Sequence, residues 1–418
     1  SLIFSILVIE ISLNYILKKN KLSENSLNKI RLDYLSQKGI EVDRRNIYQV
    51  YSDLIEKNRK AVPVVPPQSF EDLYTFGSIS KSLTISCNEN GNWPLYTSDN
   101  YGFRNPDQIK PGNVKIAFIG DSFTWGACVE TEDAIAGQIR SKSKLKTINY
   151  GVPDSGPLIQ LGILNEYVKF DKPETVFYLY YEGNDLSNLR SEKENKLLIK
   201  YLDINFSQNL KSKQSEIDMI LNKEINKRIE NKDKNKKKFK EDNIIKLLKD
   251  NLKFKNIRSL LGIDNFDGYK QVDPIYQKIL FKLKNDVEAW GGNFYFVYLP
   301  SAKHYNIFYN NKKLKYEKVI NIVKSLDIQL IDLVGQLKEM EDHKAIYELM
   351  LGVDGSEWLS NDLLANPNKP NTGSMNNIQD GEQLLYQKNG QLRMKMNYKD
   401  GKETKFLHTL NGSGLAVG

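Results

Sequence analysis

Five short apolar runs, separated by stretches with helical spacing, constrain the fold of this 418-residue chain most strongly. They are rich in β-branched and aromatic residues and occupy residues 115–120, 146–151, 175–183, 293–300 and 328–333. Such near-continuous apolar runs are typical of strands that are buried on both faces of a parallel sheet. Strands that alternate with helices favour right-handed crossovers. We therefore expect a three-layer α/β/α sandwich around a five-stranded parallel sheet.

The expected strand order is 2-1-3-4-5, with a site at the carboxyl ends of the strands. One connection, residues 185–292, is far longer than a crossover needs. Its periodic Leu and Ile residues predict a helical insert between strands 3 and 4, which could form a lid over the site. The basic residues that contribute to the net charge of +8 concentrate at residues 222–240. A single aromatic residue, Phe239, lies among them, so we expect a solvated helical face and no nucleic-acid partner.

A Gly-Asp-Ser sequence follows the first predicted strand. Ser122 would open a helix, where the backbone N–H groups and the positive end of the helix dipole can stabilise an oxyanion. Gly120 allows the chain to turn sharply, and Asp121 can cap the helix or brace the turn. Taken alone, these residues are also what an ordinary turn and cap would contain.

The next two predicted strands end in residues suited to the same task. The second ends in NYG, where Gly151 offers a backbone N–H that no Cβ screens from a substrate. The third ends in EGND, where the Asn184 side-chain amide can donate a further hydrogen bond and Asp185 follows. Three successive strand ends thus bring one hydroxyl and three hydrogen-bond donors to one edge of the sheet. This combination predicts nucleophilic chemistry at Ser122.

The segments GDSFTWG, NYGVPDSGP and YYEGNDL closely resemble blocks I, II and III of the SGNH (GDSL-like) hydrolase superfamily. The upstream YTSDNYGFRNPD resembles the lead-in of a membrane-anchored bacterial subgroup that is often associated with cell-surface polysaccharide. The resemblance covers about residues 85–342 and implies an SGNH domain with a flavodoxin-like fold over residues 76–343.

The resemblance also implies roles for individual residues. Ser122 would be the nucleophile, and its own N–H, the Gly151 N–H and the Asn184 amide would form the oxyanion hole. Gly120, Asp121 and Asp185 would support them. The implied reaction is hydrolysis or transfer of an ester acyl group, as in acylated carbohydrate, through an acyl-serine intermediate without metal or cofactor.

A serine hydroxyl needs a base, and the family base is a histidine in block V, after the fifth strand. The chain has neither a D-x-x-H nor a GHYN-like segment there. His343 and His408 are the candidate replacements, whereas we expect His304, near the fourth strand, to lie on the surface or in a supporting position. The alternative hypothesis is a catalytically impaired SGNH-like binding module or scaffold.

The C-terminal tail, residues 344–418, departs from the family pattern. Residues 381–402 resemble a MORN-type repeat, in which Asn-Gly and Asp-Gly turns join short strands into hairpins. Residues 404–418 resemble motif 3 of seryl-tRNA synthetases, but no class II catalytic domain accompanies them, so aminoacylation is rejected. These resemblances indicate a mosaic chain, from a truncated or altered reading frame, in which block V was replaced.

Residues 1–20 form an apolar segment that Glu10 and Asn14 interrupt, and we expect part of an N-terminal membrane anchor. Residues 21–75 would form a helical stalk that ends in the proline-rich connector AVPVVPPQ. The resemblance implies an extracytoplasmic, periplasmic body, whereas the lysines after the anchor favour the cytoplasm by the positive-inside rule.

The chain contains two cysteines, Cys87 and Cys128, and neither belongs to a C-x-x-C motif. They would be a reduced buried pair in the cytoplasm. Outside the cytoplasm they could form one disulfide, which would tie the lead-in segment to the first helix after Ser122.

Overall fold

The central element of the computed structural model is a parallel sheet of five strands in the order β10-β9-β8-β6-β7. Its strands are β6 (Ile116–Gly120), β7 (Thr147–Asn149), β8 (Thr175–Tyr181), β9 (Asn293–Leu299) and β10 (Gln329–Asp332). All four strand pairs are parallel. This arrangement confirms the predicted strands and their order 2-1-3-4-5.

The structure describes most of the chain between its N-terminal residues and the start of its C-terminal tail, together with short strands within that tail. The described residues are 24–37, 39–57, 59–106, 112–231, 272–301, 304, 315–339, 382–386, 392–399, 402–408, 410–411 and 414–415. The expected membrane anchor, residues 1–20, and His343 lie outside these residues. Within the described part, no helix has the length and apolar character needed to cross a membrane.

Alternate residues of the central strands pack in two different apolar clusters. In β6, Ala117 and Ile119 belong to the main core, whereas Phe118 belongs to a second cluster. The main core includes residues of α6 (Pro157–Ile163), α14 (Pro274–Ala289) and α15 (Tyr316–Ser325). The second cluster includes Ile135 and Ala136 of α5 (Ile135–Ser143). Apolar side chains thus cover both sides of these strands, which explains why the strands have continuous apolar sequences.

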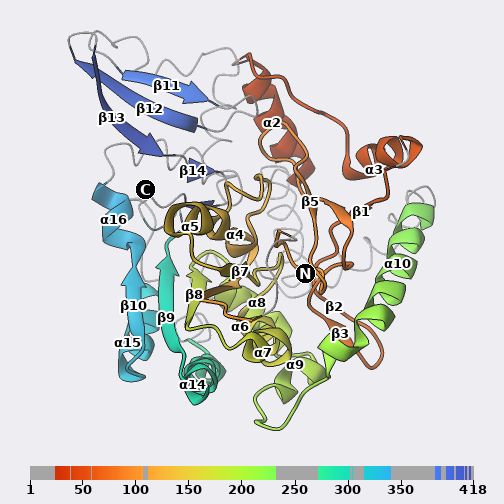
Figure 1. Cartoon of the computed structure of the whole chain (residues 1–418), viewed down its shortest axis with the longest axis vertical. Coiled ribbons are helices and arrows are strands. Elements are labelled where there is room, and N and C mark those ends of the chain that lie inside the picture. The colour runs from red at the N-terminus through yellow and green to blue at the C-terminus, as the bar shows by residue number, and fades with distance from the viewer. Residues whose placement is uncertain are drawn as a thin grey trace, which may run out of the picture.

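The long connection after β8 is helical where it is described. It contains α8 (Asp185–Glu192), α9 (Lys196–Lys200), a 3₁₀ turn at Leu210–Lys213 and α10 (Gln214–Asn231), and it ends in α14. Ile217 and Leu221 of α10 are buried in the main core. The green helix α10 lies beside the β2–β3 hairpin in Figure 1, and its Asp218 accepts hydrogen bonds from Ser80 N–H and Oγ. The described insert is therefore packed into the body.

The N-terminal part of the chain is also more integrated than a stalk. Helices α2 (Glu24–Gln37) and α3 (Ile47–Glu56) precede five short strands. These are β1 (Ala61–Pro63), β2 (Gln68–Ser69), β3 (Tyr74–Thr75), β4 (Leu83–Ile85) and β5 (Leu95–Thr97). Part of the proline-rich segment, read from sequence as a connector, is β1, which pairs with β4. Val65 and Leu73 are buried in the main core because their apolar side chains pack beside the central sheet.

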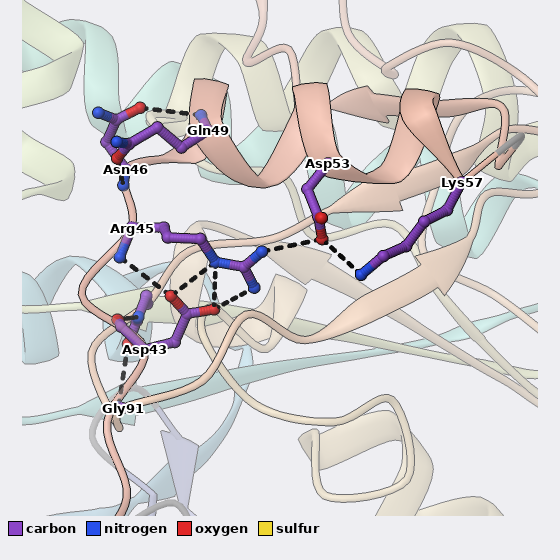
Figure 2. Close-up of polar contacts among 8 residues, drawn as sticks. Asp43, Arg45, Asn46, Gln49, Asp53, Lys57 and Gly91 are labelled. Atoms are coloured by element: carbon purple, nitrogen blue, oxygen red, sulfur yellow. Dashed lines mark hydrogen bonds and ion pairs between the residues drawn. The ribbon is translucent and has the colours of Figure 1, made fainter.

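Helix α3 begins at a capping box, which Figure 2 shows in detail. The Asn46 side chain accepts hydrogen bonds from the N–H groups of Tyr48 and Gln49, and Gln49 Oε1 accepts one from the Asn46 N–H. Arg45 binds Asp43 and Asp53 on the same surface. The local sequence thus determines where helix α3 starts. The buried face of the helix, formed by Val50 and Leu54, packs against Ala61 and Ile85.

The described strands of the tail form a separate antiparallel sheet, drawn in blue in Figure 1. It consists of β11 (Glu382–Tyr386), β12 (Leu392–Lys399) and β13 (Lys402–His408) in sequential order. Asn-Gly and Asp-Gly lie in the two connections, and these dipeptides favour tight antiparallel hairpins. Strands β14 (Leu410–Asn411) and β15 (Gly414–Leu415) form a further antiparallel pair.

Candidate active site

Ser122 follows β6, the second strand from one edge of the central sheet, and is the first residue of the short helix α4 (Ser122–Trp125). Its side chain is partly exposed, while Asp121 and Phe123 on either side are buried. Asp121 caps the helix by accepting a hydrogen bond of 3.0 Å from the Phe123 N–H. A Cβ at Gly120 would lie 2.1 Å from Thr124 Oγ1, so only glycine allows this close approach of strand and helix. The strand-turn-helix geometry therefore presents Ser122 at the carboxyl edge of the sheet.

Gly151, after the neighbouring strand β7, lies directly against α4. A Cβ at this position would lie 2.3 Å from Trp125 N, which explains the glycine. The Gly151 N–H donates to Asn149 Oδ1 at 2.9 Å, and Asn149 Nδ2 donates to Thr124 O at 2.9 Å. The predicted oxyanion donor is thus already bonded to a protein acceptor. Gly151 would have to release Asn149 before its N–H could bind a substrate.

Asn184 lies at the start of α8, at the end of β8, next to the strand that precedes Ser122. Its Oδ1 atom is buried without a hydrogen-bond partner. Burial raises the pKa of Asp121 to about 6, and the nearby Asn184 side chain opposes that rise. Asn184 and Asp121 are therefore neighbours at the carboxyl edge.

Asp185 is the second carboxyl group at this edge and is fully buried. Its Oδ2 accepts a hydrogen bond of 3.1 Å from the Tyr181 N–H, and its Oδ1 has no partner. Burial, followed by the charge of Asp121, raises the pKa of Asp185 well above its ordinary range. Two buried carboxyl groups resist ionising together, so each opposes the ionisation of the other.

A chain of buried amides connects the lead-in segment to this site. Asn105 Nδ2 donates to Asp99 Oδ2 and to Asn149 O, each at 2.9 Å, and Asn105 Oδ1 accepts from the Asn149 N–H at 2.8 Å. Asn149 in turn holds Gly151 and Thr124. Sequence reasoning assigned no role to Asn105 or Asn149. The sequence pointed to them only because both lie within motifs: Asn105 is in the lead-in segment and Asn149 is in the block II segment.

Arg104 of the lead-in segment is buried and clamps the loop after α4. Its guanidinium donates to the carbonyl oxygens of Gly126 and Val129 and to Thr131 Oγ1. It also lies over the Tyr96 ring, 4.7 Å from the ring centroid. Carbonyl and aromatic contacts thus hold this buried cation in place of a direct carboxylate contact, and they fix the chain that follows Ser122.

The same loop is joined to the lead-in region by a disulfide between Cys87 and Cys128, whose Cα atoms are 4.6 Å apart. The Asn90 side chain also donates to Cys128 O at 3.0 Å. Cys128 was expected on the first helix after Ser122, but α4 ends at Trp125 and Cys128 lies beyond it in a left-handed conformation, with φ 58°. Gly126, with φ 80°, ends the helix early and frees Cys128 to face Cys87.

The structure describes the three histidines of the chain to different extents. His304 lies after β9, and its Nδ1 is 2.9 Å from Glu182 Oε1 at the end of β8. His408 is the last residue of β13, and only its backbone is described. His343 is outside the described residues. The Glu182–His304 pair was missed because the two residues are 122 positions apart in sequence and belong to no local motif.

No family model matches the chain, and no curated protein matches it either. Among the described residues, no group of three or more His, Cys, Asp and Glu side chains could hold a metal ion. The chemistry of the site is therefore inferred from the residues at the carboxyl edge of the sheet.

Proposed function

We propose that this protein is an ester hydrolase or O-acyltransferase of the SGNH type that acts through an acyl-Ser122 intermediate. The observation that supports this most is the position of Ser122, partly exposed at the first turn after strand β6. Gly151 and Asn184 follow the carboxyl ends of the neighbouring strands β7 and β8. A serine among backbone and amide donors is the arrangement that acyl transfer requires.

The finer fold that accompanies this proposal is a three-layer, flavodoxin-like SGNH sandwich. The strand order and the two apolar clusters on alternate strand residues support it. Helices α6 and α14 would form one outer layer, and α5 would belong to the other. In such open sheets the site is at the carboxyl ends of the strands, which agrees with the position of Ser122.

The proposed substrate class is acylated carbohydrate at the cell surface, reached from an extracytoplasmic location. The Cys87–Cys128 disulfide favours this location, because structural disulfides persist in oxidising compartments and are rare in the cytosol. The lead-in segment that resembles the polysaccharide-associated subgroup contributes Arg104 and Asn105, which brace the site.

Labelling of the full chain with a fluorophosphonate tests the proposal without knowledge of the substrate. We expect one phosphonylated residue, Ser122, by peptide mass spectrometry, and no label on Ser122→Ala. Ser143→Ala, which removes an exposed hydroxyl on α5, is the matched control and should label like wild type. We also expect the wild type to hydrolyse p-nitrophenyl acetate faster than Ser122→Ala does. The proposal is contradicted if the wild type takes no label and hydrolyses this ester no faster than Ser122→Ala.

The bond between the Gly151 N–H and Asn149 favours a second candidate, a catalytically impaired SGNH-like module that binds carbohydrate or a protein. With that donor engaged, the oxyanion hole would lack one of its members, and removal of one such donor costs about 10²–10³ in rate. The labelling experiment separates the two functions, because a binding module does not need a reactive Ser122.

A further inference from the structure

The cluster of Glu182, Ser301 and His304 lies at the ends of β8 and β9. The Glu182 side chain has no solvent exposure, and that of His304 is 10% exposed. His304 Nδ1 is 2.9 Å from Glu182 Oε1 and 3.2 Å from Oε2. Ser301 donates to Glu182 Oε2 from its N–H at 2.9 Å and from its Oγ at 3.2 Å. Glu182 is thus a buried carboxylate that is held by three donors.

This contact determines which histidine nitrogen can accept a proton. In the tautomer in which His304 donates to the Glu182 carboxylate, Nδ1 carries the ring proton. The lone pair then resides on Nε2, as in the histidine of a serine-hydrolase triad. The Tyr316 ring meets the imidazole edge-on, with centroids 5.1 Å apart, and its hydroxyl donates to Asp332. The imidazole is therefore held on two sides.

One buried apolar cluster contains the sequence neighbours of both Ser122 and Glu182. Phe123, Tyr181 and Leu299 form one buried apolar cluster, and the Phe123 and Tyr181 rings lie 4.1 Å apart. Ser122 precedes Phe123, and Glu182 follows Tyr181. Strands β6 and β9 are separated only by β8. Because neighbouring strands are about 4.8 Å apart, about 10 Å separates β6 from β9, and His304 follows β9 by five residues.

We propose that His304, oriented by Glu182, is the general base for Ser122, an assignment that rests on the proposed function. His304 Nε2 takes the Ser122 hydroxyl proton as Oγ bonds to the ester carbonyl carbon. The protonated imidazole then gives that proton to the leaving alkoxide as its C–O bond breaks, which leaves acyl-Ser122. Water or a sugar hydroxyl repeats these steps in reverse, and His304 ends neutral. The Glu182 carboxylate stabilises the transient imidazolium without accepting its proton.

Fluorophosphonate labelling rates of His304→Ala and Glu182→Gln in the full chain test the assignment. His304→Ala should slow the labelling of Ser122 by about 10²–10⁴-fold, and millimolar imidazole should restore part of the rate. Glu182→Gln should slow it by at least about 10²-fold, and imidazole should not rescue it, because the histidine is still present. Glu174→Gln, at the opposite end of β8, is the matched control and should label like wild type. Thermal melts of each variant test whether it has folded.

Rescue by imidazole separates a base from a structural residue, since a free imidazole cannot repair a packing defect. Wild-type labelling rates in folded His304→Ala would overturn the assignment and leave the proposed function intact. The same conclusion follows if His343→Ala or His408→Ala abolishes labelling while His304→Ala does not. If Ser122 of the wild type takes no label and p-nitrophenyl acetate turnover equals that of Ser122→Ala, both proposals fail.

Discussion

At the scale of single residues, the buried carboxyl groups beside Ser122 are the most unusual feature of the site. Asp121 and Asp185 are each at most 1% exposed, and each has one oxygen without a hydrogen-bond partner. Burial raises the pKa of both, and the charge of Asp121 raises that of Asp185 further. An acid whose pKa is raised by folding binds more protons in the folded state. The raised pKa values therefore favour the folded state at low pH, and the contribution of Asp121 is lost as pH rises through about 6.

Asp185→Asn should reverse this loss. The amide keeps an oxygen that can accept from the Tyr181 N–H but removes the like charge. We expect the variant to be more stable than wild type at pH 8 by about 1–3 kcal/mol, and equal or less stable at pH 5. Melting temperatures at both pH values measure this, with Asp203→Asn, an exposed carboxylate, as the matched control. A stability difference that does not vary with pH would show that the two carboxyl groups do not oppose each other's ionisation.

At the scale of elements, the helices obtain their starting signals in different ways. Helix α3 begins at an exposed capping box that involves only local residues, Asn46 and Gln49. Helix α4 has only four residues and depends on the Asp121 cap, the close approach of Gly120 and the Arg104 clamp beyond its end. A short helix gains little from its own hydrogen bonds, so tertiary contacts maintain α4.

Asn46→Ala should destabilise the protein by about 1 kcal/mol, because two backbone N–H groups of α3 lose their side-chain acceptor. Asn46→Asp keeps that acceptor and should remain within a few tenths of a kcal/mol of wild type. Urea unfolding midpoints of the three proteins make the comparison. Equal midpoints for the alanine and aspartate variants would mean that the packing of Val50 and Leu54 alone sets the stability of this helix.

At the scale of the whole molecule, residues that are distant in sequence form one continuous core. The main cluster extends from Val65 before the central sheet to Ile328 at its last strand, and it includes Leu221 of the long insert. The Cys87–Cys128 bridge and Arg104 both join the lead-in segment to the loop after Ser122. The lead-in segment is thus part of the scaffold that holds the proposed nucleophile.

Removal of the bridge in Cys87→Ser/Cys128→Ser should lower the free energy of unfolding by about 4 kcal/mol. This is the chain-entropy value for two cysteines 41 residues apart. Reductant should shift the unfolding midpoint of wild type toward that of the double variant and leave the double variant unchanged. If wild type is insensitive to reductant under unfolding conditions, the bridge does not contribute to stability.

Much of the fold could be predicted from the sequence, since its signals are periodic. The five runs of apolar residues correspond to β6 to β10, and helices α5 and α15 fall within segments that had helical spacing. The proline-rich connector expected at residues 61–68 begins instead with strand β1, because a short edge strand with prolines has the composition of a connector. Cys128 was placed on a helix because the early stop at Gly126 depends on a left-handed turn that spacing does not reveal.

The sequence by itself determined the strands, their order and the position of Ser122 after the first of them, because burial on a sheet imposes an apolar pattern on consecutive residues. Only the tertiary structure decided which polar groups meet. Glu182 and His304 are 122 positions apart, and Arg104 reaches carbonyl oxygens 22 and 25 positions away. A hydrogen bond or disulfide needs a few atoms at a particular distance and angle, and such long-range pairs leave no repeating pattern along the chain. They exist only once the core has brought the strand ends together.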